Sequence, residues 1–158
     1  MNDLPRAAAE VQKAANALGL AVSVRIMPAT TRTAAEAAEA CSCPVGAIVK
    51  SLIFMGKETG RPYLILVSGA NRVDEKKVAG TLGEPIVRAD ARFVRTVSGY
   101  AIGGIPPIGH IGNLVPYIDA DLLQYETVWA AAGTPNAIFA VDPAELRDKT
   151  GGIVIAVK

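Results

Sequence analysis

One apolar segment, residues 99–110, constrains the fold of this chain more than any other part of the sequence. It reads GYAIGGIPPIGH and contains no Asp, Glu, Lys or Arg. Glycine lets a main chain pass close to a ligand and direct N–H groups at it, whereas proline fixes φ and keeps such a segment stiff. The pattern therefore predicts a rigid main-chain wall of a pocket. The alternative is a tight connection between strands that happens to be apolar.

Length and composition predict a single domain over residues 1–158, with an N-terminal helical segment over residues 1–19. Of the 158 residues, 51% are hydrophobic and 20% are charged, which allows a proper core. No apolar run approaches the length of a membrane span, and the N-terminus lacks the apolar core of a signal peptide. The cytoplasm is therefore the expected compartment, and no membrane partner is expected.

The charge balance argues against one broad class of nucleic-acid binding. The chain has 16 Lys and Arg against 15 Asp and Glu, a formal net charge of +1. A nearly neutral chain does not coat a duplex by bulk electrostatics, so any contact with RNA is expected to be local, at a strand end. The same balance, with no recognisable helix-turn-helix, argues against a DNA-binding protein.

Helix and strand signals follow one another without a strict βα repeat, and tight turns join several of the strands. This mixture predicts an α/β fold of the mixed, α+β-like kind, a curled mixed β-sheet surrounded by helices. The expected helices are residues 7–18, 34–40, 73–82, 91–97 and 142–148, with a helical turn at 120–123. The expected strands are residues 21–27, 45–55, 63–68, 86–88, 115–118, 128–132, 137–141 and 153–157.

Lys50 is the candidate functional side chain. Alternation along the expected strand places it on the same face as Ile48, Leu52 and Phe54. An ammonium on an apolar face costs on the order of several kcal/mol unless it meets an anion or a polar cavity. Two interpretations remain: an edge strand from which Lys50 reaches water, or a cleft into which it projects.

The other chemically interesting residues carry weaker signals. Cys41 and Cys43 are expected to be small half-buried thiols, because zinc would need two more ligands and the chain has one His and no further Cys. We expect no metal and no cofactor. His110 is expected to be a hydrogen-bonded structural residue rather than a general base. The basic residues between positions 72 and 95 alternate with acidic ones, which is typical of a solvated face; the alternative is that they steer a phosphodiester toward the cleft.

Four segments match, in order, the motifs of one known family. They are residues 48–52, residues 66–71 running into 74–77, residues 98–109 with a Gly-x-x-x-Pro pattern at 103–107, and residues 132–135. With these segments the chain resembles the YbaK/ProX family of aminoacyl-tRNA deacylases, which includes the editing domain of bacterial prolyl-tRNA synthetase and free-standing relatives. The resemblance covers about residues 20 to 157. Each motif alone is weak, and the ordered set is fairly specific.

The resemblance implies a trans-editing hydrolase that deacylates mischarged aminoacyl-tRNA, either tRNA-Pro or another tRNA that carries a small wrong amino acid. It implies that the family's invariant lysine is Lys50 and that its glycine loop is Gly103 and Gly104, which are the expected catalytic residues. The alternative is a non-catalytic module that binds an aminoacyl or nucleotide end. The expected substrate-binding residues are Ser68, Gly69, Asn71, Pro107, Gly133 and Thr134.

The implied chemistry is ester hydrolysis without a metal. Lys50 would bind the terminal phosphate or ribose oxygens, or would stabilise the oxyanion, while the N–H groups of Gly103 and Gly104 would contact the carbonyl oxygen or the water. Many relatives carry a His where this chain has Thr134, which donates a hydrogen bond and does not titrate. Rigid walls favour Ala, Ser, Cys, Thr or 2-aminobutyrate and exclude Pro. The expected partner is the tRNA acceptor end, with a synthetase or an elongation factor as helper, and the expected state is a monomer or homodimer.

Overall fold

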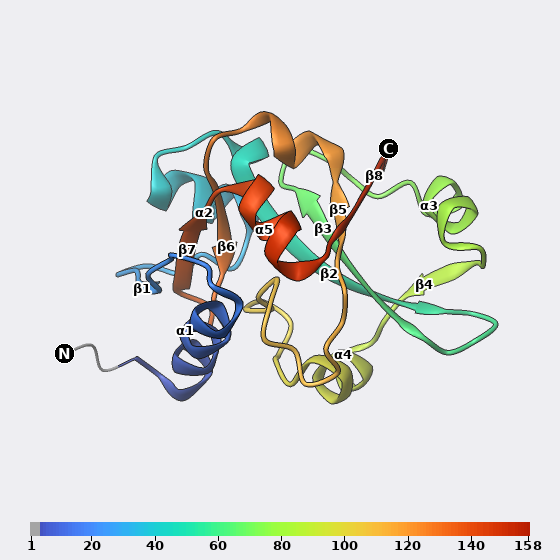
Figure 1. Cartoon of the computed structure of the whole chain (residues 1–158), viewed down its shortest axis with the longest axis horizontal. Coiled ribbons are helices and arrows are strands. Elements are labelled where there is room, and N and C mark those ends of the chain that lie inside the picture. Colours follow the sequence, from blue (N-terminus) through green and yellow to red (C-terminus); the bar gives the residue numbers. More distant parts are fainter. Residues whose placement is uncertain (1–3) are drawn as a thin grey trace.

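The computed structural model describes residues 4–158 and contains a single mixed sheet of eight strands with helices packed around it (Figure 1). The predicted fold class is confirmed. The strands are β1 (Arg25–Ile26), β2 (Ile48–Gly56), β3 (Pro62–Ser68), β4 (Ile86–Arg88), β5 (Tyr117–Asp119), β6 (Val128–Ala131), β7 (Ala137–Val141) and β8 (Ile153–Ile155). The helices are α1 (Arg6–Leu18), α2 (Ala34–Cys41), α3 (Glu75–Leu82), α4 (Ala91–Ser98) and α5 (Pro143–Thr150), with short 3₁₀ helices η1 (Val45–Ala47) and η2 (Ala120–Gln124).

The sheet has the order β1-β7-β6-β2-β3-β5-β8, with β4 also paired to β2. The β2–β3 hairpin is antiparallel, as its tight turn requires, and it extends furthest to the right in Figure 1. The pairs β2–β6, β3–β5 and β5–β8 are parallel. β2 thus has strand neighbours on both sides, but on the side away from β3 they pair only with its two ends. Lys50 lies between those ends and pairs with β3 alone.

Four expected strands are shorter or shifted in the structure, for identifiable reasons. Of the expected strand 21–27, only residues 25 and 26 form a strand, β1. The preceding backbone is bonded instead to the Gln12 side chain of α1, whose amide nitrogen donates to the Val22 carbonyl and whose oxygen accepts from the Val24 N–H. Residues 45–47 form η1 after Pro44 rather than the start of β2. Strand 115–118 begins only after Pro116, and strand 153–157 ends at Ile155.

The predicted helices begin and end close to where their capping residues stand. Thr33 and Glu36 form a reciprocal capping box at α2, and Asp74 and Asp90 accept N–H bonds at the starts of α3 and α4. Gly19 adopts a left-handed conformation, φ 79°, that ends α1. Residues 1–3 of the expected N-terminal helical segment lie outside the described residues.

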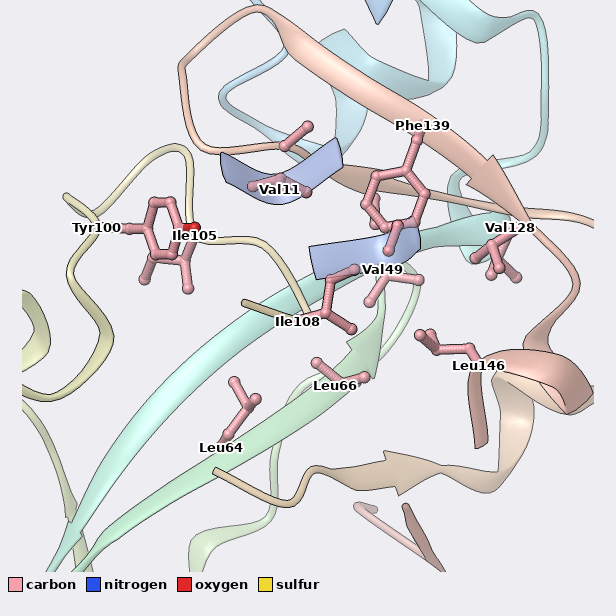
Figure 2. Packing of buried hydrophobic residues seen from close by; sticks show 14 of the residues in the cluster. Val11, Val49, Leu64, Leu66, Tyr100, Ile105, Ile108, Val128, Phe139 and Leu146 are labelled. Atoms are coloured by element: carbon pink, nitrogen blue, oxygen red, sulfur yellow. The ribbon is translucent and has the colours of Figure 1, made fainter. Parts of the chain in front are cut away.

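The main core lies between the sheet and the covering elements (Figure 2). Val11 of α1, Val49 of β2 and Phe139 of β7 are buried within it. Tyr100, Ile105 and Ile108 reach the same core from the long connection between α4 and β5, residues 99–116, which we call the glycine–proline loop. The loop is therefore held down by its own apolar side chains. Within residues 4–158, no helix is long and apolar enough to cross a membrane.

Candidate functional site

A gap in the sheet creates the principal cavity. On the side of β2 away from β3, β6 pairs only with Ile48 and Val49, and β4 pairs only from Phe54 onward. Residues 50–52 therefore have a strand neighbour on one side alone. A cavity of about 580 Å³ opens at this point, and its walls come from β2, from the ends of β4 and β6, from residues 31–37 and from the glycine–proline loop.

Lys50 lines this cavity, as the cleft interpretation predicts. Its side chain is only half-exposed, and its ammonium donates a 2.6 Å hydrogen bond to the main-chain carbonyl of Asn71. Burial lowers the pKa of Lys50, and the charges of Arg88 and Arg72 lower it further, while Asp119 opposes them. The site therefore holds a partly desolvated cation that is fixed at one point of its wall.

Two further cations and an apolar surface complete the cavity. Arg32 and Arg88 are exposed and stand among its lining residues, so three positive groups surround an opening in a nearly neutral protein. The apolar wall includes Ile53, Val94 and Ile105, which are buried. This combination suits a ligand with an anionic or oxygen-rich part and a small apolar part.

Ser51 adds a polar group that the protein leaves unpaired. Its residue is 9% exposed, and its hydroxyl has no hydrogen-bond partner among the described residues, although it lines the cavity. An unsatisfied buried hydroxyl costs about 1–3 kcal/mol. The oxygen itself is shielded from solvent, so a ligand recovers that cost only where the wall around Ser51 opens to it.

Gly103 and Gly104 have different positions. Gly103, with φ +103°, lines the cavity, and the Arg32 side chain packs against it, 3.1 Å from where a Cβ would stand. Gly104 is buried beside the cavity, and its N–H donates to the Ala101 carbonyl at 3.2 Å. Only Gly103 of this pair faces the same space as Lys50.

The glycine–proline loop and the β6–β7 turn touch through their main chains. A Cβ on Gly104 would stand 2.9 Å from backbone atoms of Thr134, and the Gly133 N–H donates to the Gly104 carbonyl at 2.8 Å. The Thr134 hydroxyl donates to the Asn136 side chain at 3.3 Å, and Thr134 is not among the residues that line the cavity. Gly133 and Thr134 thus pack against the glycine–proline loop at Gly104 without lining the cavity.

The remaining expected site residues lie behind Lys50 or elsewhere. Ser68, the last residue of β3, Gly69 and Asn71 form a turn, and none of the three lines the cavity. Asn71 is linked to the site through its carbonyl, which accepts from Lys50. A Cβ on Gly69 would stand 2.3 Å from the Val45 carbonyl oxygen, so this glycine serves close packing against η1. Pro107 lines a separate hollow of about 310 Å³ between α1 and the glycine–proline loop.

His110 and the two cysteines lie apart from the cavity, in line with the structural roles expected for them. The Nε2 of His110 lies 2.6 Å from the Pro106 carbonyl, so this nitrogen carries the proton, and burial lowers the pKa of the ring. Cys41 and Cys43 are free thiols. Burial raises the pKa of Cys41 to about 11, which keeps it a neutral thiol. Residues 4–158 contain no cluster of three or more His, Cys, Asp or Glu side chains that is arranged to hold a metal ion.

Sequence reasoning missed Ser51, Arg32 and Trp129 as lining residues, while Arg88 belongs to the basic residues 72–95 whose alternative role was to steer a phosphodiester toward the cleft. Ser51 stands next to Lys50, but strand alternation assigns it to the opposite face, and only the missing neighbour strand lets both residues reach one cavity. No sequence signal distinguishes Arg32 from other surface arginines.

The chain belongs to the aminoacyl-tRNA editing-domain family, whose model matches residues 28–149. The resemblance found in the sequence is therefore confirmed. The chain is 46% identical to a solved structure described as that of a candidate trans-editing enzyme for prolyl-tRNA synthetase, with a TM-score of 0.92 and 99% of each chain covered.

Two curated bacterial relatives match three quarters of the chain. The uncharacterized protein YwhH of Bacillus subtilis is 31% identical over 119 residues, which is 75% of each protein. EbsC of Enterococcus faecalis, described as a candidate Cys-tRNA(Pro)/Cys-tRNA(Cys) deacylase, is 27% identical over 121 residues, which is 76% of this chain and 73% of EbsC.

Proposed function

We propose that this protein hydrolyses the ester bond of mischarged aminoacyl-tRNA in the cavity between β4 and β6. The observation that carries the proposal is that Lys50 and Gly103, from segments far apart in the sequence, line the same cavity. Membership of the aminoacyl-tRNA editing-domain family supports the same chemistry.

The reaction needs positioning and charge stabilisation more than a strong catalyst. A water molecule adds to the ester carbonyl, the bond to the ribose oxygen breaks, that oxygen takes a proton, and the free amino acid leaves. Gly103 presents main chain to the carbonyl oxygen or to the water, and the Lys50 ammonium neutralises the oxyanion or holds the terminal ribose and phosphate oxygens. We assign Gly104 to packing rather than to substrate contact, because its N–H is donated inside the loop.

The remaining substrate contacts follow from the lining of the cavity. Arg32 and Arg88 line the opening and are exposed, so they can meet the phosphate of a 3′ end. We propose that the aminoacyl group reaches the Ser51 hydroxyl, which is buried in the free protein and has no partner among the described residues. The apolar wall of Val94 and Ile105 suits a short side chain. We therefore propose a tRNA that carries a small wrong amino acid as the substrate, with tRNA-Pro included because EbsC and the trans-editing neighbour are described in connection with proline.

The partner contact is proposed to be confined to the acceptor end. Three cations at one opening, on a chain of net charge +1, favour a short stretch of backbone over a whole tRNA surface. A synthetase or an elongation factor that presents the charged end would compensate for weak binding. We propose that the protein acts as a monomer or homodimer, since every residue used above comes from one chain.

The experiment that tests the function is a panel of tRNAs charged with labelled Pro, Ala, Ser, Cys, Thr or 2-aminobutyrate. We expect release of at least one small amino acid well above the uncatalysed rate, with Pro spared, and an unchanged rate in EDTA. Tight binding of charged tRNA without release of any amino acid contradicts the proposal. That outcome favours the non-catalytic binding module. Thr134 keeps this alternative open, because many relatives have a His at this position and Thr134 does not titrate.

A further inference from the structure

The anchor of the Lys50 ammonium belongs to a turn rather than to a strand. Lys50 Nζ donates to the Asn71 carbonyl at 2.6 Å. Residues 68–71 form this turn, which is closed by a 2.9 Å bond from the Asn71 N–H to the Ser68 carbonyl. The Asn71 carbonyl is fixed only if the turn is fixed. The position of the Lys50 ammonium therefore depends on the groups that hold residues 68–71 in place.

A single carboxylate holds both ends of that turn. Asp119 Oδ2 accepts from the Ser68 N–H at 3.0 Å and from the Asn71 side-chain amide at 2.9 Å. The residue is 2% exposed and stands at the end of β5. β3 and β5 run parallel, with Leu66 paired to Ile118, so their carboxyl ends meet and bring Asp119 to the turn.

Two further hydrogen bonds tie Asp121 into this cluster. Asp119 Oδ1 accepts from the Asp121 N–H at 2.9 Å, and Asp121 Oδ2 accepts from the Asn71 amide nitrogen at 2.8 Å. The Asn71 amide thus donates to two carboxylates. Asp119, a buried carboxylate, accepts three hydrogen bonds, and charge-assisted bonds of this kind stiffen the cluster.

We propose that Asp119 is a positioning residue for Lys50, because it fixes the turn whose Asn71 carbonyl holds the ammonium at the cavity wall. Asp119 is not among the residues that line the cavity, so it acts through Asn71 rather than on the substrate. The catalytic meaning of this role rests on the proposed deacylase function. The positioning of Lys50 by Asp119 does not depend on that function, and it can be measured without a substrate.

The first test compares Asp119→Asn with Glu84→Gln. Glu84 is a matched control, since it is also a buried carboxylate that accepts main-chain N–H bonds, and it does not line the cavity. We expect Asp119→Asn and Asn71→Ala to lower kcat by about 10- to 100-fold, with a smaller change in KM, as small displacements of a reacting group do. Glu84→Gln should keep wild-type kcat per folded molecule.

A double-mutant cycle separates positioning from general destabilisation. In a Lys50→Ala background, Asp119→Asn should lower the residual rate by less than about twofold, because its effect passes through the lysine that has been removed. An equal loss in both backgrounds overturns the proposal. Thermal unfolding of each variant shows that folded protein is being compared.

The second test reads Lys50 directly, in the free protein, from the pH dependence of its side-chain NMR signals. In the described part of the chain, the charged groups that act on Lys50 are Arg72 and Arg88, which lower its pKa, and Asp119, which raises it. Removal of that negative charge should lower the pKa of Lys50 in Asp119→Asn and leave it unchanged in Glu84→Gln. An unchanged pKa together with unchanged kcat overturns the inference. A shifted pKa in Asn71→Ala, where the Asp119 charge remains, in a protein that deacylates nothing on the panel upholds the positioning role and refutes the proposed function.

Discussion

Gly104 is the residue at which the glycine–proline loop meets the β6–β7 turn. Its φ is not positive, so the requirement for glycine here is one of space: a Cβ would stand 2.9 Å from backbone atoms of Thr134. Backbone cannot rotate away as a flexible side chain can. Two of the four segments that match the editing family are therefore in direct contact, and the wall of the cavity depends on this contact.

Gly104→Ala is predicted to destabilise the protein by about 1–3 kcal/mol, the usual cost of an overpacked site, and to lower deacylation because the loop is displaced. Denaturant unfolding measures the first effect, and the charged-tRNA assay measures the second. The matched control is Gly80→Ala on α3, where nothing lies within 4 Å of the added carbon. Helix propensity predicts that the control gains about 0.5–1 kcal/mol. Equal stability of both variants would contradict this account.

Ser51→Ala is predicted to separate stability from activity. Its hydroxyl has no partner within residues 4–158, so its removal should leave the free energy of unfolding unchanged or raise it by up to about 1 kcal/mol. Loss of a substrate hydrogen bond should raise KM about tenfold. Steady-state kinetics and urea unfolding on the same preparation provide the comparison. A destabilised variant with normal KM would show that the hydroxyl serves the fold.

The sequence was informative at residues whose type conflicts with their surroundings. Lys50 among apolar neighbours and the stiff GYAIGGIPPIGH segment both identify parts of the cavity. Ser68, Asn71, Gly133 and Thr134 belong to segments that support the cavity, but a motif match does not distinguish a lining residue from a supporting one. That distinction depends on which backbone atoms meet in three dimensions.

At the scale of elements, the tip of the β2–β3 hairpin is tied to the segment between α3 and β4. Glu84 accepts from the N–H groups of Glu58 and Thr59, from the Thr59 hydroxyl at 2.7 Å and from the Tyr63 hydroxyl at 2.6 Å. These bonds favour the carboxylate and lower the pKa of Glu84 to about 2, with the Tyr63 bond the largest cause.

This depressed pKa predicts a specific acid response. Because the folded-state pKa lies below the ordinary value near 4.5, the carboxylate stabilises the fold above pH 4.5, and that contribution is lost as the pH falls from 4.5 toward 2. Glu84→Gln should therefore be less stable than the wild type at pH 7, with a difference that narrows by pH 3. Urea unfolding at both pH values measures the difference in the free energy of unfolding between the two proteins. An equal difference in stability at both pH values would contradict the lowered pKa of Glu84.

Helices and strands were predictable where local signals, such as capping residues and alternation, determine them. They were less predictable where a side chain from another element binds the backbone. The helices that begin after Thr33, Asp74 and Asp90 were expected close to their observed bounds. The strand expected at 21–27 is largely absent, because Gln12 of α1 satisfies the backbone at Val22 and Val24. No local pattern reveals that competition.

At the scale of the whole molecule, the sheet order creates the site. β6 and β4 pair with opposite ends of β2, and the cavity fills the interval between them. A mixed sheet was predictable from the tight turns and the absence of a βα repeat, but the gap was not, because strand order is a long-range property.

The whole-molecule charge predicts a weak dependence of RNA binding on salt. If only Lys50, Arg32 and Arg88 meet phosphates, the slope of log K against log salt should be about −2, at roughly 0.7 per phosphate for a single strand. Anisotropy of labelled uncharged tRNA between about 50 and 200 mM salt measures it. A slope steeper than about −5 would indicate a broad backbone footprint and would contradict a contact limited to the acceptor end.

The most direct test of the account is the single-turnover deacylation rate of Lys50→Ala on the best substrate of the charged-tRNA panel. The exposed Lys76, on α3, provides the control variant Lys76→Ala. We predict that Lys50→Ala loses at least about 100-fold in rate while its circular dichroism and thermal transition remain those of a folded protein, and that Lys76→Ala keeps the wild-type rate. A folded Lys50→Ala protein with the wild-type rate would contradict the assignment of the cavity.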